Sequence, residues 1–571
     1  MPENAVHHST FRRLTAIAPL LTVLLLVVPV LAGLVGALGP AFGWLPALGS
    51  SELTLVHWQA LAETPGIVDM IRLSLVTGLI STALALGIVL MFLAAYGETR
   101  LFRLVQRLLS PLLAVPHAAA AIGLAFLLAP SGLALRIASP TLTGLTTPPD
   151  YLFPGDPWGL SLIAGLVLKE VPFLLLMSLA ALPQCQAEQR RQVARSLGYA
   201  PVSAFLKAVL PALYPLIRLP IYAVIAFASS TVDVAMILGP STPPPLAVAV
   251  VHWLNDPDLS RRFLASAAAL TQFTVTALAL ACWWLLECLL RRLLAARLID
   301  GRRRAGQSCA RWLGGASTLL SIALLGASLA GLLLWSVAAY WPFPSSWPQP
   351  LTLSTWQRAT PGLAAPLWDT LSLALSATLV SLCLVIGCLE SETLNHRKMG
   401  PGAAMVLYLP LLVPPVAFLY GLVQLQAQLG SRPGWLAVML GHCLFVMPYV
   451  FLSLAESYRR MDPRWSQVAA SLGCSDFTIF WRVRLPMLMA PIAVAAAVGL
   501  AVSVGQYLPT LLLGAGRLST LTTEAVTLAS GGDRRLTAVF ALAQLMLPAL
   551  GFALALGLPR LLHRHRRALL P

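Results

Sequence analysis

The sequence predicts an all-α polytopic membrane protein with about twelve transmembrane helices, arranged as two parallel halves of six. Three observations predict this fold class: the composition, the spacing of the apolar runs, and a polar stretch that occurs twice. Of the 571 residues, 58% are hydrophobic and only 11% are charged, and the mean hydropathy is +0.80. A chain with so few polar residues cannot cover the surface of a water-soluble globule.

The apolar runs that are long enough to cross a bilayer of about 30 Å fall into two sets of six. The sets lie at 14–38, 70–95, 108–129, 158–183, 212–239 and 263–290, and at 315–340, 366–390, 403–425, 434–456, 487–513 and 536–559. The first run follows Arg12-Arg13 and resembles a signal sequence, but it is long and has no evident cleavage site. We expect it to remain as a signal anchor.

The Lys and Arg residues predict the orientation of these spans. With the N-terminus in the cytoplasm, 28 of the 38 basic residues fall in cytoplasmic segments, including the tail from Arg560. Because basic residues favour the cytoplasmic side, both termini are predicted to be cytoplasmic. Six is an even number, so the two halves run parallel rather than inverted. The net charge of +16 then reflects membrane topology, and no nucleic-acid partner is expected.

Three segments follow from this count. Residues 1–290 are expected to form the first half and residues 315–571 the second. Residues 291–314 form a basic cytoplasmic linker with Gly301-Arg-Arg-Arg304 at its centre. Each half is expected to carry one polar cytoplasmic loop, at 186–212 and at 461–487.

These two loops hold the repeated stretch. The segment from Gln192 to Pro211 recurs from Gln467 to Pro486, 275 residues later and without a gap. A repeat of this kind sets the architecture of the whole chain. Weaker matches support it: Pro172 and Pro448 lie 276 apart, and Pro116 and Pro414 lie 298 apart.

Each copy is predicted to be a helix, a glycine hinge and a second helix. Gly198 and Gly473 can take the left-handed conformation that ends a helix. Pro201 suits the first turn of the following helix, and Ser475 can cap it in the second copy.

The second helix carries an apolar stripe at the i, i+3, i+4, i+7 positions. The stripe consists of Val202, Phe205, Leu206 and Val209, and its weaker equivalent of Phe477, Phe480, Trp481 and Arg484. Two interpretations stay open: the helix lies on lipid or neighbouring spans, or it docks in a groove of a cytoplasmic partner.

The pattern resembles the EAA loop of bacterial importer permeases of the ATP-binding-cassette (ABC) class. The resemblance implies that each loop is a coupling helix received by an ATPase subunit, and that a periplasmic solute-binding protein delivers the substrate. The positions carried over are Gln192, Ala194, Gly198, Phe205, Leu210 and Pro211, and Gln467, Ala469, Gly473, Phe480, Leu485 and Pro486. Gln192 and Gln467 depart from the family, which usually has Glu there and so has a charge that would pair with the ATPase.

The resemblance covers nearly the whole chain, because two such loops in one chain of twelve spans resemble the fused permeases of the iron(III) and thiamine importers. It implies a multi-pass protein of the bacterial inner membrane, in contact with lipid, that binds an ATPase, expected in two copies. The protein itself is expected not to be an enzyme.

Four polar residues in the spans are candidates for the substrate path. Asp233 and Gln506 lie in the spans that follow the two loops, and Lys169 and Glu170 lie before the first. Ionisable groups within a membrane usually face protein or water and are often functional. The alternatives are a buried acid satisfied by its neighbours for Asp233, and helix packing or gating for Lys169-Glu170.

The sequence contains no Gly-x-x-x-x-Gly-Lys-Ser/Thr phosphate loop, so ATP hydrolysis is expected on a separate chain. The eight cysteines show no C-x-x-C spacing, and neither a metal site nor a cofactor is expected. The alternative function is a twelve-span secondary transporter driven by an ion gradient. Sparse intramembrane charge and the paired loops argue against it.

Overall fold

The computed structural model describes residues 2–97, 99–304, 307–396, 399–430 and 432–562. Helices joined by loops make up these residues, with no strand among them. Their only extended pairings are two isolated bridges, Leu45 with Ser50 and Ala338 with Leu351. The end of the predicted cytoplasmic tail, 563–571, lies outside the described residues. The all-α prediction is confirmed.

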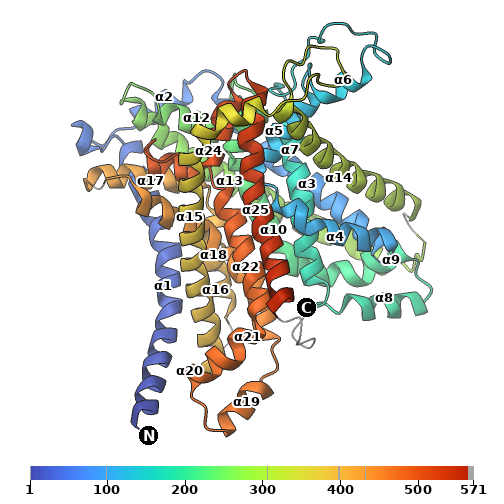
Figure 1. Cartoon of the computed structure of the whole chain (residues 1–571), viewed down its shortest axis with the longest axis vertical. Helices are drawn as coiled ribbons and strands as arrows, with labels where there is room; N and C mark the ends of the chain where they lie inside the picture. The colour runs from blue at the N-terminus through green and yellow to red at the C-terminus, as the bar shows by residue number, and fades with distance from the viewer. Residues whose placement is uncertain (1, 98, 305–306, 397–398, 431, 563–571) are drawn as a thin grey trace.

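The elements of the first half appear in the order of Figure 1. They are α1 (Pro2–Ala41), η1 (Pro46–Leu48), α2 (Val56–Ala62), α3 (Ile67–Tyr96), α4 (Arg100–Ala114), α5 (His117–Leu128), α6 (Leu133–Ala138), α7 (Leu160–Ala181), α8 (Ala187–Ser196), α9 (Pro201–Ala204), η2 (Phe205–Val209), α10 (Leu210–Ser230), α11 (Asp233–Leu238), α12 (Leu246–Leu254) and α13 (Arg261–Leu298).

The second half repeats this order from α14 onward. Its elements are α14 (Gln307–Val337), α15 (Ser354–Leu394), α16 (Pro401–Leu412), α17 (Pro415–Gln428), α18 (Trp435–Arg459), α19 (Arg464–Ser471), α20 (Asp476–Ile479), η3 (Phe480–Arg484), α21 (Leu485–Met487), α22 (Met489–Val504), α23 (Leu508–Gly514), α24 (Leu521–Ala529) and α25 (Arg534–Leu562).

The internal duplication is visible in the helix boundaries. The bounds of α9 and α20, of η2 and η3, and of α12 and α24 all differ by 275. The ends of α3 and α15, and the starts of α5 and α17, differ by 298. The two offsets read from the sequence therefore relate structural elements and not only residues.

Within the described residues, ten helices are long and apolar enough to cross a membrane, or up to twelve if each of two bent pairs is one span. One pair bends by 85° between Leu412 and Pro415, where Pro414 and Pro415 interrupt the helix. The other bends by 74° at Leu488. The predicted spans 212–239 and 487–513 are each divided further, into α10 and α11 and into α22 and α23.

Both copies of the repeated stretch lie in the lower part of Figure 1, where the start of α1 and the end of α25 also lie. Helices α2, α12 and α24 and the loop around α6 lie in the upper part. This arrangement agrees with the prediction that the two coupling loops share one side of the membrane.

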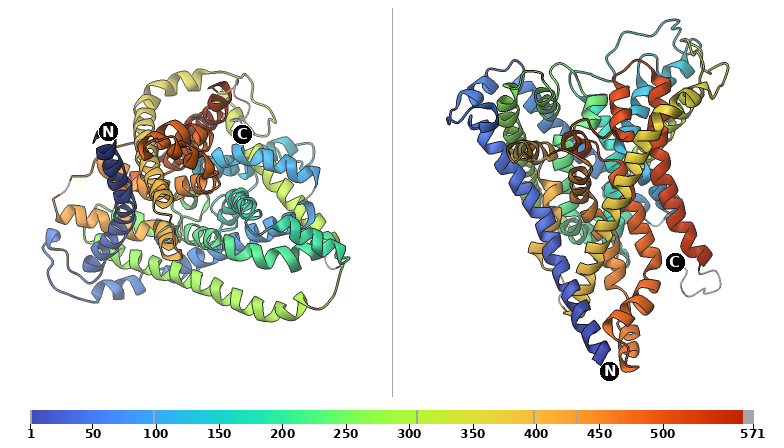
Figure 2. Two further views of the ribbon diagram at one scale, coloured as in Figure 1. Left: turned by 90° about the horizontal axis from the view of Figure 1, so that it is seen from below. Right: turned by 60° about the vertical axis from the view of Figure 1, so that its left-hand side comes forward.

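The first helix of each half packs on the other half. Helix α1 contacts α15, α16 and α17, and α14 contacts α3, α5 and α7; α1 runs along the outside of the molecule in Figure 2. The contact of α1 with α17 is very close, because a Cβ atom on Gly421 would lie 1.6 Å from the backbone oxygen of Gly33. Only residues without a side chain allow the two backbones to approach this closely.

Candidate functional site: two coupling loops and a closed path

The two loops have the same backbone turn. Gly198 has a φ of +84° and Gly473 a φ of +80°. In the first loop the amide of Gly198 donates to the Arg195 carbonyl at 2.9 Å, and in the second the amide of Gly473 donates to the Ala470 carbonyl at 2.9 Å. A residue with positive φ closes the end of the first helix in each copy. The predicted left-handed glycine turn between two helices is confirmed in both copies.

The second helix of each loop also begins as predicted. Pro201 occupies the first turn of α9, and the side chain of Ser475 accepts a hydrogen bond from the Thr478 amide at 3.2 Å. Each helix then continues as one π-helical turn, η2 or η3. Such turns are rare and often mark functional positions.

The apolar stripe of the first copy faces its own chain. Val202, Phe205 and Val209 are buried in an apolar cluster with residues of α3, α7 and α10, and only Leu206 is exposed. In the second copy Phe480 is buried, whereas Phe477 and Trp481 are exposed. Of the two interpretations, packing on neighbouring spans describes the first stripe.

Exposed apolar side chains that occur at equivalent positions in both copies lie at the first helix of each loop. Val193 of α8 is 62% exposed, and Leu197, which caps the end of that helix, is 58% exposed. Val468 of α19 and its cap residue Leu472 are 57% and 78% exposed. Residues four apart share one face of a helix, and both pairs occupy equivalent positions, 275 apart. We call these four residues the docking face.

Sequence reasoning missed the docking face, although a signal was available. Both copies keep a valine and a leucine at the same positions. A search for a continuous apolar stripe passes over two isolated residues.

The remaining predicted coupling residues surround this face. Gln192 and Gln467 are exposed next to it, and the Gln192 amide donates to Glu188 Oε1 at 3.1 Å. Ala194 and Ala469 are buried, and Pro211 and Pro486 lie at the start of the following helices. Next to the docking face this chain therefore has an uncharged glutamine, Gln192 or Gln467, where the EAA loop of importer permeases usually has a glutamate.

Each loop is held by contacts with another part of the chain: the linker before the second half contacts the first loop, and the start of α1 contacts the second loop. At the first loop, the Ala200 amide donates to the Arg303 carbonyl of the linker at 2.9 Å, and Lys207 pairs with Asp300. The hydrogen bond from Lys207 lowers the pKa of the exposed Asp300 carboxyl below its ordinary value. At the second loop, Arg12 of α1 pairs with Asp476 at 2.7 Å.

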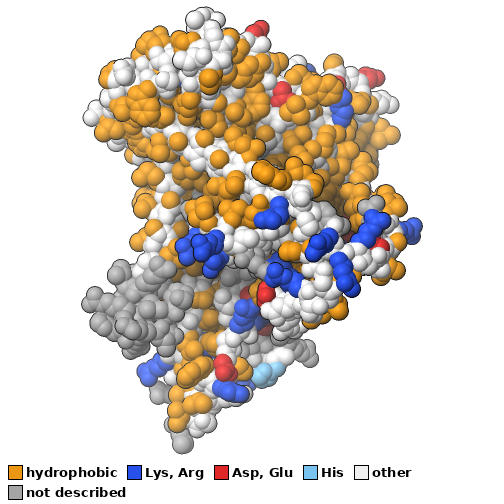
Figure 3. All heavy atoms as spheres, turned by 90° about the vertical axis from the view of Figure 1, so that its right-hand side faces the viewer, with side chains coloured by type: hydrophobic (Ala, Val, Ile, Leu, Met, Phe, Trp, Pro, Cys, Tyr) orange, Lys and Arg blue, Asp and Glu red, His pale blue; other side chains and the backbone are white. Residues whose placement is uncertain are grey.

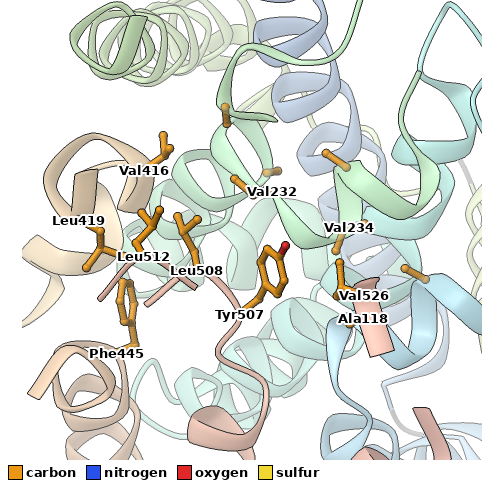
Figure 4. Packing of buried hydrophobic residues seen from close by; sticks show 14 of the residues in the cluster. Ala118, Val232, Val234, Val416, Leu419, Phe445, Tyr507, Leu508, Leu512 and Val526 are labelled. Carbon is orange, nitrogen blue, oxygen red and sulfur yellow. The ribbon is translucent and has the colours of Figure 1, made fainter. Parts of the chain in front are cut away.

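Above the loops, the spans that follow them are broken. Helix α10 ends at Ser230 and α11 begins at Asp233, and α22 ends at Val504 and α23 begins at Leu508. Tyr507 lies in the second break. Figure 4 shows its ring between Leu508 on one side and Val232 and Val234, which lie at the first break, on the other. Its hydroxyl lies 3.4 Å from the Met236 sulfur of α11. Apolar side chains of both halves thus close the interface at this level.

The two polar candidates at these breaks are not equivalent in the repeat. Asp233 is buried and accepts a hydrogen bond from Thr231 at 3.0 Å. Its equivalent is Leu508, whereas the equivalent of Gln506, which is half-buried, is Thr231. Both breaks nevertheless place one polar side chain beside the closed interface.

Lys169 and Glu170 do not pair with each other. On α7, the Lys169 ammonium donates to the carbonyl oxygens of Leu112 and Val115 at 3.2 and 2.6 Å, at the end of α4. Glu170 accepts a hydrogen bond from Ser81 of α3 at 3.4 Å. Both side chains are buried at helix contacts, so Lys169 satisfies backbone groups that the break between α4 and α5 leaves without helical partners.

Among the residues that the structure describes, no group of three His, Cys, Asp or Glu side chains could hold a metal ion.

Comparisons with known proteins agree with this geometry. A family model described as "Binding-protein-dependent transport system inner membrane component" matches residues 394–567. The chain is 34% identical over 508 residues to the inner membrane ABC transporter permease protein YnjC of Escherichia coli (strain K12). This match covers 88% of this chain and 91% of that protein.

Two shorter relatives match part of the chain. The molybdenum transport system permease protein ModB of Mycobacterium tuberculosis (strain ATCC 25618 / H37Rv) is 27% identical over 161 residues, 26% of this chain and 61% of that protein. The spermidine/putrescine transport system permease protein PotC of Escherichia coli (strain K12) is 27% identical over 124 residues, 21% of this chain and 47% of that protein. The match thus spans about three fifths of the first relative and about half of the second.

Proposed function

The chain belongs to the inner membrane permeases of binding-protein-dependent ABC transporters, and from this premise we propose that its two loops each receive one copy of a cytoplasmic ATPase. The protein is the multi-pass, non-catalytic permease subunit of an importer, and such a subunit works with an ATPase and a binding protein. The number of ATPase copies, the contact residues and the orientation are our proposals.

One observation carries the two-copy proposal: the docking face occurs twice. Val193 and Leu197 in one loop and Val468 and Leu472 in the other are equivalent, exposed and apolar. Exposed leucine and valine on a polar helix lose contact with water when a partner covers them, which stabilises the complex. Gln192 and Gln467 would then offer amide hydrogen bonds at the edge of the same contact.

The distribution of charge supports a cytoplasmic position for both loops and both termini. Figure 3 shows a broad surface of hydrophobic side chains with Lys and Arg gathered below it. Basic side chains concentrate on the cytoplasmic side of membrane proteins. With this orientation we propose the same division of the chain as before: two membrane-spanning halves, 1–290 and 315–571, joined by a cytoplasmic linker, 291–314.

We further propose that the substrate path runs between the two helix breaks. Asp233 and Gln506 flank the contact of Tyr507 with Met236, so separation of α11 from α23 would expose both polar groups. Lys169 and Glu170 would act at a distance, by holding the end of α4 and the contact of α7 with α3. In this proposal, the contact of Tyr507 with Met236 closes the substrate path in the state that precedes movement of the loops by the ATPase.

A cross-linking experiment tests the coupling proposal. The permease is purified in nanodiscs together with the ATPase that co-purifies with it, and cysteine is placed at Val193 or at Val468 in separate variants. Each variant is expected to cross-link to the ATPase, and native mass spectrometry of the complex is expected to show two ATPase copies per permease. Cross-linking from only one loop, or a single ATPase copy, would contradict the proposal.

A further inference from the structure

Three buried polar side chains meet at the base of the second loop. They are Glu390 of α15, Tyr458 of α18 and Arg484 of η3. The Arg484 guanidinium donates through Nη1 to Glu390 Oε1, and the Tyr458 hydroxyl donates to Glu390 Oε2. Arg484 also donates through Nε to Ser466 Oγ of α19 at 3.1 Å. One guanidinium therefore ties both helices of the loop to the end of α15.

The first half has apolar residues at all three equivalent positions. The offsets of 298, 276 and 275 relate Glu390 to Phe92, Tyr458 to Leu182 and Arg484 to Val209. Phe92 and Val209 are buried in one apolar cluster, and Leu182 packs against it. The ion pair is thus a feature of the second half alone.

The first loop is fastened by a different arginine. Arg191 of α8 is buried, donates through Nη2 to the Leu93 carbonyl at 3.3 Å, and lies over the Phe205 ring at 5.6 Å. Leu93 is in the last turn of α3, the counterpart of α15. The repeat relates Arg191 to Ser466. The arginine therefore lies on the first helix of the first loop and on the second helix of the second loop. In both halves it contacts the end of the equivalent span, α3 or α15.

We propose that Arg191 and Arg484 are positioning residues that fasten the two coupling loops to α3 and α15, so that movement of a loop by the ATPase moves the span. The inference rests on the proposed coupling function. Stability alone does not explain a buried ion pair, because apolar residues of similar volume are often as stable. Apolar contact is non-directional, whereas hydrogen bonds from a planar guanidinium fix the relative position of two helices.

The first half supplies the design of the test. The triple variant Glu390→Phe, Tyr458→Leu, Arg484→Val gives the second half the apolar residues of the first without an arginine at position 466. The additional change Ser466→Arg restores a guanidinium at the position that Arg191 occupies. Its expected acceptor is the backbone carbonyl of residue 391, the equivalent of Leu93.

The experiment measures how accessible the substrate path is, in addition to the stability of the protein. The complex with its co-purified ATPase is placed in nanodiscs, and a cysteine at Gln506 is labelled with a charged maleimide, with and without ATP and vanadate. Site-specific labelling is quantified by mass spectrometry of the peptide. In the wild-type background, nucleotide is expected to change the labelling rate at least tenfold.

The triple variant is expected to keep its ATPase and its thermal unfolding midpoint but to lose most of this nucleotide-dependent change. Adding Ser466→Arg is expected to restore the change to within threefold of wild type. A purely structural role would leave the nucleotide-dependent change intact in the triple variant, and that result would overturn the inference, as would a failure of Ser466→Arg to restore it.

A matched control lies two residues away on α15. Glu392 pairs with Arg459 at 3.0 Å, nearer the surface, and Glu392→Gln is expected to leave the labelling change within twofold of wild type. An equal loss in this control would also overturn the inference. The coupling proposal fails separately, if a wild-type complex that retains its ATPase shows no nucleotide-dependent change at position 506.

Discussion

Removing the leucines of the docking face should weaken ATPase binding by an amount that follows from their exposure. Leu197 is 58% exposed and Leu472 is 78% exposed. Full burial of a leucine side chain contributes about 1.5–3 kcal/mol. In proportion to exposure, a partner that covers these side chains gains about 0.9–1.7 kcal/mol at Leu197 and about 1.2–2.3 kcal/mol at Leu472.

These energies translate into measurable affinities. Since 1.4 kcal/mol corresponds to a tenfold change, Leu197→Ala should weaken binding of the ATPase about 5- to 20-fold and Leu472→Ala about 8- to 50-fold. The two leucines lie on separate loops, so the effects should add in free energy, and the double variant should lose about 40- to 1000-fold in affinity. Binding is measured by biolayer interferometry with immobilised nanodiscs that contain the permease.

The control is a leucine of similar exposure on the opposite side of the molecule. Leu142, near α6, is 84% exposed, and Leu142→Ala should leave the affinity unchanged. All three variants should have the thermal unfolding midpoint of the wild type, because none of these side chains is in the core. The reasoning is refuted if the double variant loses less than threefold in affinity, or if Leu142→Ala weakens binding as much.

Three further variants test other features of the fold. Gly473→Val meets no atom within 4 Å but must adopt a φ of +80°, so it should cost about 1–2 kcal/mol in loop conformation and weaken ATPase binding without loss of membrane insertion. Gly421→Val places a Cβ atom 1.6 Å from the Gly33 oxygen and should destabilise the protein by about 3 kcal/mol or more, seen as a lower unfolding midpoint. Asp300→Asn removes the partner of Lys207. Because the pKa of Asp300 is lowered in the folded protein, the contact contributes fully above the ordinary carboxyl pKa of about 4. The difference in midpoint from wild type should shrink as the pH falls below that value and vanish below the lowered pKa.

Each of these variants has an outcome that contradicts its reasoning. Wild-type affinity in Gly473→Val would show that the left-handed turn is not required. Gly87→Val is the control for Gly421→Val, since it also lies in a helix but has nothing within 4 Å; equal destabilisation would argue against a specific clash. A difference between Asp300→Asn and wild type that persists in acid would show that the carboxylate charge does not carry the contact.

The features that depend on local backbone chemistry could be predicted from the sequence. Gly198, Gly473, Pro201 and Ser475 act within a few residues of themselves, and the structure has each of them in the predicted conformation. The twelve apolar runs were equally readable, because each span must be apolar along its own length.

Features that depend on distant contacts could not be predicted in this way. The burial of Phe205 depends on α3 and α7. Periodicity pointed to the stripe on the second helix and could not decide between packing and docking, whereas the exposed pair that both copies share lies at the first helix. Glu390 and Arg484 are 94 residues apart, and only a comparison of the two halves position by position singles them out. Lys169 is likewise explained by backbone carbonyls of Leu112 and Val115, which no side-chain pattern reveals.

The exchange of first helices has a consequence for biosynthesis. Helix α1 leaves the ribosome first, yet Gly33 and Gly36 meet their partners Phe418 and Gly421 only after more than 380 further residues have been made. Until then its small-residue face has no protein to contact and must wait in lipid or with the insertion machinery. The packing of the amino-terminal half is therefore completed only after the second half of the chain has been made.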